Sequence, residues 1–159
     1  MEVTEGGKAP NFHMKTDNQG EIKFSDIKDK NIVLYFYPKD LTPGWTKEAC
    51  AFRENAEEFS KINTVIIGVS KDSVKRHDNF KAKYDLPFSL ASDEDGKACE
   101  AYGTWVQKSM YGKKYMGIER STFLIDNKGV VRKIWRKVKV KGHVEDVLEN
   151  AKSIWIMRL

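Results

Sequence analysis

The chain is poor in the residues that build disulfide frameworks and zinc sites. Its 159 residues include two cysteines, Cys50 and Cys99, and three histidines, His13, His77 and His143. Two cysteines in a chain of this length do not make a disulfide framework. There is also no Cys-x-x-Cys pair, so the sequence argues against a zinc site.

Long hydrophobic runs are absent as well. No stretch of eighteen or more apolar residues occurs, so we expect no membrane span and no membrane partner. The opening residues, Met-Glu-Val-Thr-Glu-Gly-Gly, lack the basic and then apolar order of a secretory signal. Both features favour a cytoplasmic protein, in which thiols are kept reduced.

The excess of positive charge is mild. The formal net charge is +5 and the pI about 9.1, which favours contact with anions. In the densest basic run, residues 132–141, charges mostly alternate with Ile134, Trp135, Val138 and Val140. That alternation predicts a strand with one solvated face. The alternative is a nucleic-acid patch, but the chain has no recognition motif, so we expect no nucleic-acid partner.

Length and composition favour one domain over residues 1–159, with 40% hydrophobic and 32% charged residues. Short apolar runs rich in β-branched and aromatic residues predict central strands at 31–37, 64–69 and 121–126. Further short strands are predicted at 11–14, 22–24, 87–90 and 130–135, and helices at 44–60, 73–84, 97–102 and 143–157. Residues 103–117 are expected to form an irregular loop. This order of elements predicts an α/β fold.

Three local features refine these predictions. Ser73 is the expected N-cap of its helix, and Asn127-Lys-Gly129 is a hairpin turn signal. In helix 44–60, a core-facing stripe is predicted from the spacing of Ala49, Phe52, Ala56 and Phe59. The charged residues of that helix are assigned to the opposite, solvated side: Lys47, Glu48, Arg53, Glu54 and Glu57.

The stretch from Tyr35 to Cys50 is the one around which a reactive site is expected. It starts as a buried strand, passes through a loop rich in proline and glycine, and continues as a helix. The first turn of a helix has unpaired backbone N–H groups and the positive end of the helix dipole. Both favour an anion, such as a thiolate or a bound oxyanion.

This stretch carries a family resemblance. Phe-Tyr-Pro-Lys-Asp-x-Thr-Pro-Gly-x-Thr-Lys-Glu-Ala-Cys, residues 36–50, resembles the active-site motif of peroxiredoxins of the bacterioferritin-comigratory, or peroxiredoxin Q, branch. Residues 96–103, 110–117 and 120–126 also look like that branch, so the resemblance covers nearly the whole chain. It implies a thioredoxin-like fold, with a central mixed sheet flanked by helices.

The resemblance also implies a function. The branch reduces hydrogen peroxide and organic hydroperoxides with electrons from thioredoxin, and requires no metal or organic cofactor. We therefore expect a hydroperoxide substrate, a thioredoxin-type reductant, and a monomer or weak dimer. A non-catalytic, peroxiredoxin-like binding or holdase protein is the alternative.

Five positions match the catalytic residues of the family. In the family, a thiolate at position 45 attacks the peroxide and becomes a sulfenic acid, but this chain has Trp45. Cys50 resembles the resolving cysteine, Thr42 the hydroxyl that bonds the peroxide, and Arg120 the cation that pairs with thiolate and substrate. Pro38 resembles the ring that shields the pocket from water. Taken singly, such a threonine is more often a turn or cap residue, and such an arginine a surface residue.

Trp45 leaves three interpretations open. It replaces the cysteine of an otherwise working peroxidase, since the two codons differ by one base; or it belongs to a descendant that lost catalysis; or another thiol has taken over. Cys50 is then an idle thiol or a substitute nucleophile. We expect Trp45 to fill the peroxide pocket or to displace the first helical turn, with overpacking costing roughly 1–3 kcal/mol if it stays inside.

Cys99 fits one apolar stripe with Tyr102, which predicts a buried structural cysteine. A disulfide between Cys50 and Cys99 is the alternative. The apolar segment at 153–157 is expected to dock the last helix on the sheet, with a dimer or membrane-surface contact as the alternative.

Overall fold

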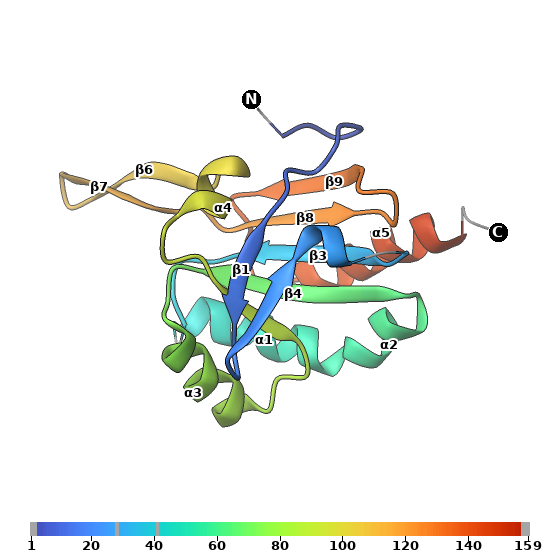
Figure 1. Ribbon diagram of the computed structural model, residues 1–159. Helices are drawn as coiled ribbons and strands as arrows, with labels where there is room; N and C mark the ends of the chain where they lie inside the picture. Colours follow the sequence, from blue (N-terminus) through green and yellow to red (C-terminus); the bar gives the residue numbers. More distant parts are fainter. Residues whose placement is uncertain (1–2, 28, 41, 157–159) are drawn as a thin grey trace.

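The computed structural model describes residues 3–27, 29–40 and 42–156. A seven-stranded mixed sheet forms the centre, in the order β2-β1-β5-β4-β3-β8-β9, and a separate ribbon pairs β6 with β7 (Figure 1). The strands are β1 (His13–Thr16), β2 (Gly20–Lys23), β3 (Asn31–Phe36), β4 (Thr64–Ser70), β5 (Ser89–Ser92), β6 (Trp105–Met110), β7 (Lys113–Ile118), β8 (Ser121–Ile125) and β9 (Val131–Arg136). The helices are α1 (Pro43–Glu54), α2 (Ala56–Lys61), α3 (Val74–Tyr84), α4 (Lys97–Ala101) and α5 (His143–Ile156), with a 3-10 turn at Phe24–Asp26.

The middle of the sheet combines parallel and antiparallel pairing. β3 pairs in parallel with β4, and β4 in parallel with β5, whereas β8 runs antiparallel to β3 on its other side. Val33 is thereby placed opposite Ile66 on β4 and opposite Leu124 on β8. The carboxyl end of β3 leads through a short loop into α1, so the motif stretch lies at this edge of the sheet.

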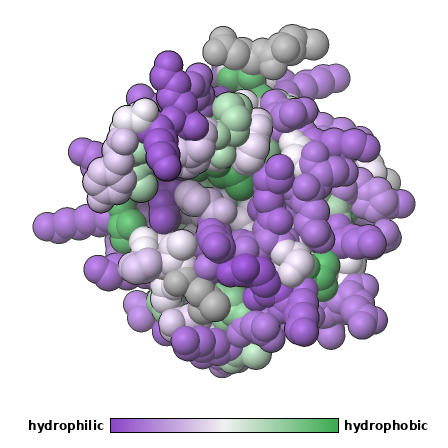
Figure 2. Space-filling view, turned by 90° about the vertical axis from the view of Figure 1, so that its left-hand side faces the viewer, coloured by the Kyte–Doolittle hydropathy of each residue, from purple (hydrophilic) through white to green (hydrophobic). Residues whose placement is uncertain are grey.

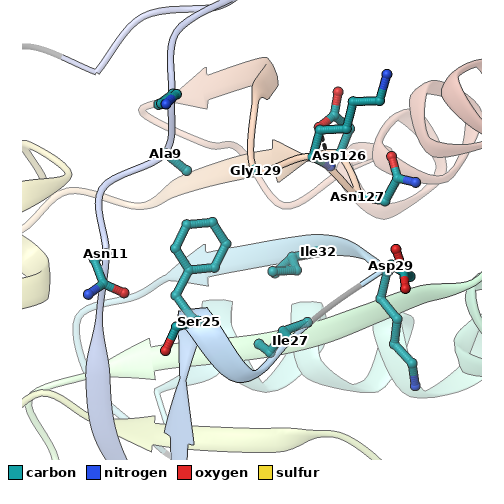
Figure 3. A pocket seen from close by; sticks show the side chains of 13 residues that line it. Ala9, Asn11, Ser25, Ile27, Asp29, Ile32, Asp126, Asn127 and Gly129 are labelled. Carbon is teal, nitrogen blue, oxygen red and sulfur yellow. Dashed lines mark hydrogen bonds between the residues drawn. The ribbon is translucent and has the colours of Figure 1, made fainter.

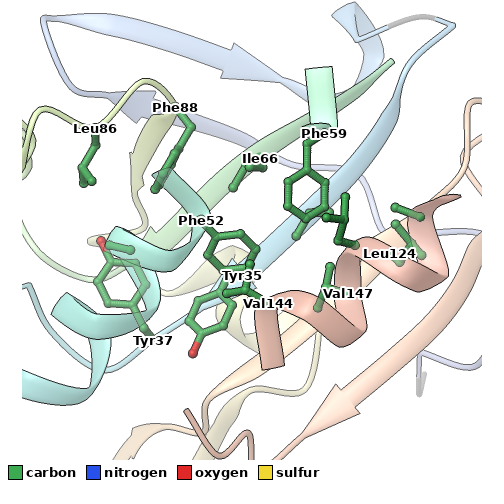
Figure 4. Packing of buried hydrophobic residues seen from close by; sticks show 14 of the residues in the cluster. Tyr35, Tyr37, Phe52, Phe59, Ile66, Leu86, Phe88, Leu124, Val144 and Val147 are labelled. Carbon is green, nitrogen blue, oxygen red and sulfur yellow. The ribbon is translucent and has the colours of Figure 1, made fainter. Parts of the chain in front are cut away.

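Both faces of the sheet are covered, which explains the continuous apolar run of β3. Val33, Tyr35 and Tyr37 belong to a buried cluster that also takes side chains from α1, α2, α3 and α5 (Figure 4). Ile32, Leu34 and Phe36 alternate with them and belong to the cluster on the opposite face, which includes residues of α4. The predicted central strands and their flanking helices are therefore confirmed.

Several local predictions are also confirmed. Ser73 caps α3, because its Oγ accepts a hydrogen bond from the backbone N–H of Arg76 at 3.2 Å. A tight turn over residues 127–129 joins β8 to β9. In α5, Ile154 is buried, whereas Ile156 is 64% exposed, so docking of the last helix holds only in part. Met157 lies outside the described residues.

The prediction of an irregular loop at 103–117 is wrong, since this segment forms the β6–β7 hairpin. Tyr111 and Gly112 both have positive φ angles, 52° and 78°, as the two central residues of a type I′ turn require. The glycine at the second turn position was the available signal. The hairpin extends away from the sheet (Figure 1), and Tyr111 at its tip is 98% exposed.

The prediction of one helix over 44–60 is also wrong, because the helix breaks at Asn55. Asn55 leaves helical geometry, with ψ at 6°, and its side-chain amide donates to the carbonyl oxygen of Ala51 at 2.8 Å. Such local side-chain bonds to the backbone compete with helix continuation. Ala49, Phe52 and Phe59 are buried as expected, but Ala56 is only partly so.

The surface suits a protein that does not embed in a bilayer. Within the described residues, no helix has both the length and the apolar character needed to cross a membrane. The side of the molecule seen from the left of Figure 1 is covered mainly by hydrophilic residues, with apolar ones in small patches (Figure 2).

Candidate active site

The candidate site lies where the loop after β3 enters α1. Thr42 is the N-cap residue and Pro43 occupies the first helical position, where its missing N–H costs nothing. The first turn is closed by a hydrogen bond from the backbone N–H of Thr46 to the carbonyl oxygen of Thr42, at 2.9 Å. The expected strand–loop–helix arrangement is thus present.

Trp45 lies in this first turn with its side chain in the protein core. It has no exposed surface, and its ring stacks on Tyr37 with centroids 3.8 Å apart and on Tyr35 at 4.9 Å. Phe80 of α3 packs against it at 6.2 Å. On the sheet side, Gly68 leaves the necessary room, because a Cβ atom there would lie 3.2 Å from the indole ring.

Of the two outcomes expected for Trp45, the displaced helical turn is wrong. The turn is intact, and the indole is accommodated by three aromatic rings and a glycine. No nucleophilic atom remains at this position, since the indole offers only an N–H donor.

Arg120, directly before β8, lies against the first turn of α1. Its Nη2 atom would be 2.7 Å from a Cβ atom at position 44, so the guanidinium packs on the backbone at Gly44. A larger residue at 44 would force the guanidinium away. Arg120 and position 45 are therefore neighbours, as the family resemblance implied, and Arg120 is not a freely solvated surface residue.

Glu48 was assigned to the solvated side of the helix, and that assignment is wrong. The residue has no exposed surface. It lies three positions after Trp45, and residues at this spacing share a helix face, so the helical period could have predicted its burial. Burial raises the pKa of Glu48 to about 8, with Arg120 acting in the opposite direction and Glu145 adding to the rise.

A protonated Glu48 changes the charge balance of the site. Near neutral pH its carboxyl group is neutral, so it does not cancel the charge of Arg120. Burial and the proximity of Glu48 also raise the pKa of the Tyr35 phenol, although Arg120 opposes the rise. Tyr35 and Glu48 are thus both neutral, and this part of the site carries the positive charge of Arg120.

Several polar atoms of this group are buried without a hydrogen-bond partner among the described residues. They are Tyr35 Oη, Trp45 Nε1, both carboxylate oxygens of Glu48, and Arg120 Nη1. Unpartnered buried polar atoms are rare in folded proteins and are typical of sites whose polar groups serve a purpose other than stability. Tyr35 and Glu48 were both missed as site residues by the sequence analysis.

Thr42 and Pro38 lie in the loop itself. The Thr42 hydroxyl donates to the carbonyl oxygen of Lys39 at 2.8 Å and makes no capping bond to the helix. Pro38 is partly buried directly after β3. Both positions flank the first turn of α1, and their implied roles stay predictions.

The two thiols are far apart in the fold. Cys50 is partly exposed on α1, two turns beyond the helix start, whereas Cys99 is buried in the cluster on the other face of the sheet. Both are free, so the proposed disulfide between them is wrong. Burial raises the pKa of the Cys99 thiol, and hydrogen bonding with Asp93 adds to this effect. Cys99 is therefore a buried structural cysteine, as predicted.

His143, at the start of α5, lies beside the same aromatic group. Its ring centroid is 5.8 Å from that of Tyr35, and its Nε2 atom is 2.7 Å from the Thr122 hydroxyl. Burial lowers the pKa of His143 to about 4, opposed by Asp146 and Glu145, so the ring is neutral at pH 7. It tethers α5 to β8 without adding charge to the site.

A separate surface cavity of about 530 Å³ lies near the start of β3, at the opposite end of the strand from Trp45 (Figure 3). Its lining includes Ala9, Ile27, Asp29, Ile32 and Asp126. None of its lining residues is a cysteine or histidine, so the cavity has no group suited to nucleophilic or acid–base catalysis at neutral pH.

Comparison with known proteins assigns this arrangement to a family. Residues 6–134 match the AhpC/TSA family. The chain is 54% identical over 148 residues to a putative peroxiredoxin bcp from Coxiella burnetii, covering 93% of this chain and 98% of that protein. It is 53% identical over 154 residues to peroxiredoxin Bcp from Bacillus subtilis, covering 97% and 98%.

Solved structures agree with these matches. The bacterioferritin comigratory protein of Xanthomonas campestris, studied for alkyl peroxide reduction, superposes with a TM-score of 0.87 at 44% identity, covering 91% of this chain and 92% of the other. A cysteine-to-serine mutant of Xylella fastidiosa PrxQ superposes with a TM-score of 0.91 at 39% identity, covering 96% and 98%. The thioredoxin-like fold expected from the motif is thereby confirmed.

Proposed function

This chain belongs to the AhpC/TSA family of peroxiredoxins, which are thiol-dependent peroxidases, and we propose that its own catalytic cycle is blocked at the first step. The observation that carries this proposal is the indole at position 45. It is fully buried against Tyr35 and Tyr37, and it has no atom that can attack a peroxide.

The missing step is a nucleophilic displacement at oxygen. A thiolate at position 45 would attack the distal oxygen of a hydroperoxide, forming an S–O bond and breaking the O–O bond. The sulfur is oxidised to a sulfenic acid, and the alkoxide or hydroxide leaves and takes up a proton. Arg120 is proposed to stabilise the thiolate and the developing negative charge, and Thr42 to orient the peroxide. Pro38 is proposed to exclude water.

The other thiols do not supply a substitute. Cys99 is buried away from this edge, and the rise in its pKa disfavours the thiolate. Cys50 lies beyond the first helical turn, where the helix dipole has little effect. Its proposed place is that of the resolving cysteine, which would condense with the sulfenic acid. Thioredoxin or a similar dithiol would then reduce the disulfide.

The setting of this activity is also part of the proposal. We assign the chain to the cytoplasm, where a thioredoxin-type reductant is supplied and where the free state of Cys50 and Cys99 is maintained. A monomer or weak dimer is proposed. Support comes from the mainly hydrophilic surface in Figure 2.

A second candidate function is that of a non-catalytic, peroxiredoxin-like binding protein. The observation that favours it is the fit of Trp45, whose ring is packed by three aromatic side chains and by the open space at Gly68. A core adapted to an indole suits a protein that no longer needs the thiol.

The test is hydrogen peroxide consumption in the presence of thioredoxin, thioredoxin reductase and NADPH. The parent chain is compared with its Trp45→Cys variant, and Trp45→Ser is the matched control, with the same steric change but no thiol. We expect turnover only from Trp45→Cys.

Each other outcome selects an alternative. Turnover by the parent would show that Cys50 or Cys99 acts as nucleophile, and single Cys→Ser variants would identify it. Inactivity of all three proteins would contradict the intact-site proposal and favour the binding protein.

A further inference from the structure

A network of buried polar side chains lies beneath the loop between β3 and α1. Tyr37 Oη donates to Asp40 Oδ1 at 2.6 Å, and the Asp40 backbone N–H donates to Asp72 Oδ2 at 2.8 Å. Ser70 Oγ also donates to Asp72 Oδ2, at 2.6 Å. On the other side, His77 Nδ1 of α3 lies 2.6 Å from Asp40 Oδ2, and both side chains are fully buried.

The second ring nitrogen of His77 determines its charge. Nε2 lies 3.0 Å from the carbonyl oxygen of Ala91, which can only accept a hydrogen bond. Nε2 therefore carries a proton. Nδ1 faces a carboxylate oxygen, and imidazole is the stronger base of that pair, so the proton they share belongs to the ring. Both nitrogens then donate, and His77 is an imidazolium ion paired with the Asp40 carboxylate.

The remaining charge in the network is also matched. Asp72 Oδ1 lies 3.3 Å from Nε of Arg76, at the more exposed end of the network. Asp40, Asp72 and His77 have donor atoms of the kind that bind divalent cations. Each carboxylate is already engaged by N–H or O–H donors, and the Nδ1–Oδ2 contact leaves no space for an ion between them, so the geometry is that of a hydrogen-bonded ion pair.

The network is connected to the candidate active site at two points. Asp40 lies two residues before Thr42, the N-cap of α1. Tyr37, whose hydroxyl is bonded to Asp40, stacks on the ring at position 45 with an interplanar angle of 11°. The position of Asp40 therefore influences both the loop that carries Thr42 and the wall that faces residue 45.

We propose that His77 is a positioning residue for the candidate active site: its positive charge holds Asp40, and through Asp40 it orders the loop carrying Thr42 and the Tyr37 ring that packs on residue 45. Without that charge, the Asp40 carboxylate is buried without a counter-ion, which strongly favours opening of the loop. The kinetic part of this proposal rests on the proposed peroxidase function, and the structural part does not.

The charge state is tested first, on the parent chain, by proton–nitrogen NMR of the histidine rings at neutral pH. We expect protons on both ring nitrogens of His77, with imidazolium-type shifts and slow exchange with water. A His77 ring with one unprotonated nitrogen would overturn the proposal.

Loop order is tested by amide hydrogen exchange in His77→Gln. The Asp40 amide should exchange at least about tenfold faster than in the parent, because a buried charge has lost its partner. Ser73→Ala is the matched control, since it weakens the same helix without touching the His77 ring. The double variant His77→Gln/Asp40→Asn removes both charges and should restore much of the protection.

The contrary results are equally defined. Unchanged exchange at Asp40 in His77→Gln would contradict the proposal. So would acceleration that is equal at Asp40 and at Ile67 in the centre of β4, since that pattern reports global destabilisation. An equal response to Ser73→Ala would reduce His77 to a structural role.

The kinetic arm uses the Trp45→Cys background. Adding His77→Gln should lower kcat/KM for hydrogen peroxide by about 10²-fold, as expected for a misplaced reacting group. Adding Ser73→Ala instead should leave it near the Trp45→Cys value, and an equal loss in the two would overturn the positioning role. Inactivity of Trp45→Cys itself would refute the proposed function, while the NMR and exchange results would still decide the role of His77.

Discussion

At the scale of single residues, the site is determined by what surrounds position 45. Trp45 is enclosed by aromatic rings, and Arg120 packs on the backbone one residue earlier. Glu48 and Tyr35 lie beside it with polar atoms that have no partner in the described part of the chain. A large apolar ring therefore occupies a position bordered by polar groups, and the two contributions can be separated by mutation.

The stability of Trp45→Cys should differ from that of the parent chain. Removing a fully buried indole that stacks on Tyr35 and Tyr37 leaves a cavity, so the free energy of unfolding should fall by about 2–5 kcal/mol. Urea denaturation measures it, with Trp45→Phe as the control that keeps an aromatic ring and should lose less. A more stable Trp45→Cys would show instead that the indole is overpacked.

The pH dependence of stability should report Glu48. Its pKa of about 8 in the folded state lies above the ordinary value of 4.5. Between these values the unfolded chain loses the proton while the folded chain keeps it, so the Glu48 contribution to stability is full below about pH 4.5 and is lost as pH rises toward 8.

Glu48→Gln removes this dependence. Its free energy of unfolding relative to the parent should increase from pH 5 to pH 8, by about 1–3 kcal/mol, the usual penalty of an unsatisfied buried group. Urea titrations at several pH values check this, and parallel profiles of the two proteins would show that Glu48 is solvated.

At the scale of elements, the starts of α1 and α3 use similar residues differently. The Ser73 hydroxyl accepts a hydrogen bond from the first turn of α3, whereas the Thr42 hydroxyl donates to a loop carbonyl oxygen. One cap residue thus contributes to helix stability, and the other has a hydroxyl that the helix does not use. That difference is expected where a side chain serves a substrate.

Two alanine substitutions should therefore have opposite effects. Ser73→Ala should lower the free energy of unfolding by about 1 kcal/mol, and Thr42→Ala by less. In the Trp45→Cys background, Thr42→Ala should lower kcat/KM for peroxide by about 10²-fold, and Ser73→Ala should not. Denaturation and steady-state kinetics on the same four proteins decide this, and equal kinetic effects would remove Thr42 from the proposed site.

At the scale of the whole molecule, one sheet contributes to both hydrophobic clusters. Successive residues of β3 alternate between them, with Val33 in one and Leu34 in the other. Neither cluster can lose its packing without disturbing the strand that both share. The chain should therefore behave as one cooperative unit, which is the prediction of a single domain.

Equilibrium unfolding tests that prediction. Far-ultraviolet circular dichroism and tryptophan fluorescence, which is sensitive to the buried Trp45, should give superimposable urea transitions. A fluorescence change that precedes the loss of secondary structure would show that the cluster around α1 unfolds separately.

The sequence by itself determined the order of elements, the central strands, the Ser73 cap and the motif around position 45. These depend on local composition and spacing, which act within a few residues. The β6–β7 hairpin was missed although Gly112 marked its turn, because its exposed strands carry little apolar periodicity. The absence of a nucleophile at Trp45 was likewise evident from the sequence.

Only the tertiary structure decided which polar residues are buried and what they contact. Glu48 is buried because α1 packs that face onto the sheet and α5, and the pairing of Asp40 with His77 joins residues 37 positions apart. The inward course of the Trp45 ring depends on Tyr37, Phe80 and the open space at Gly68. Burial and pairing of this kind arise from elements distant in the chain, and local sequence patterns do not encode them.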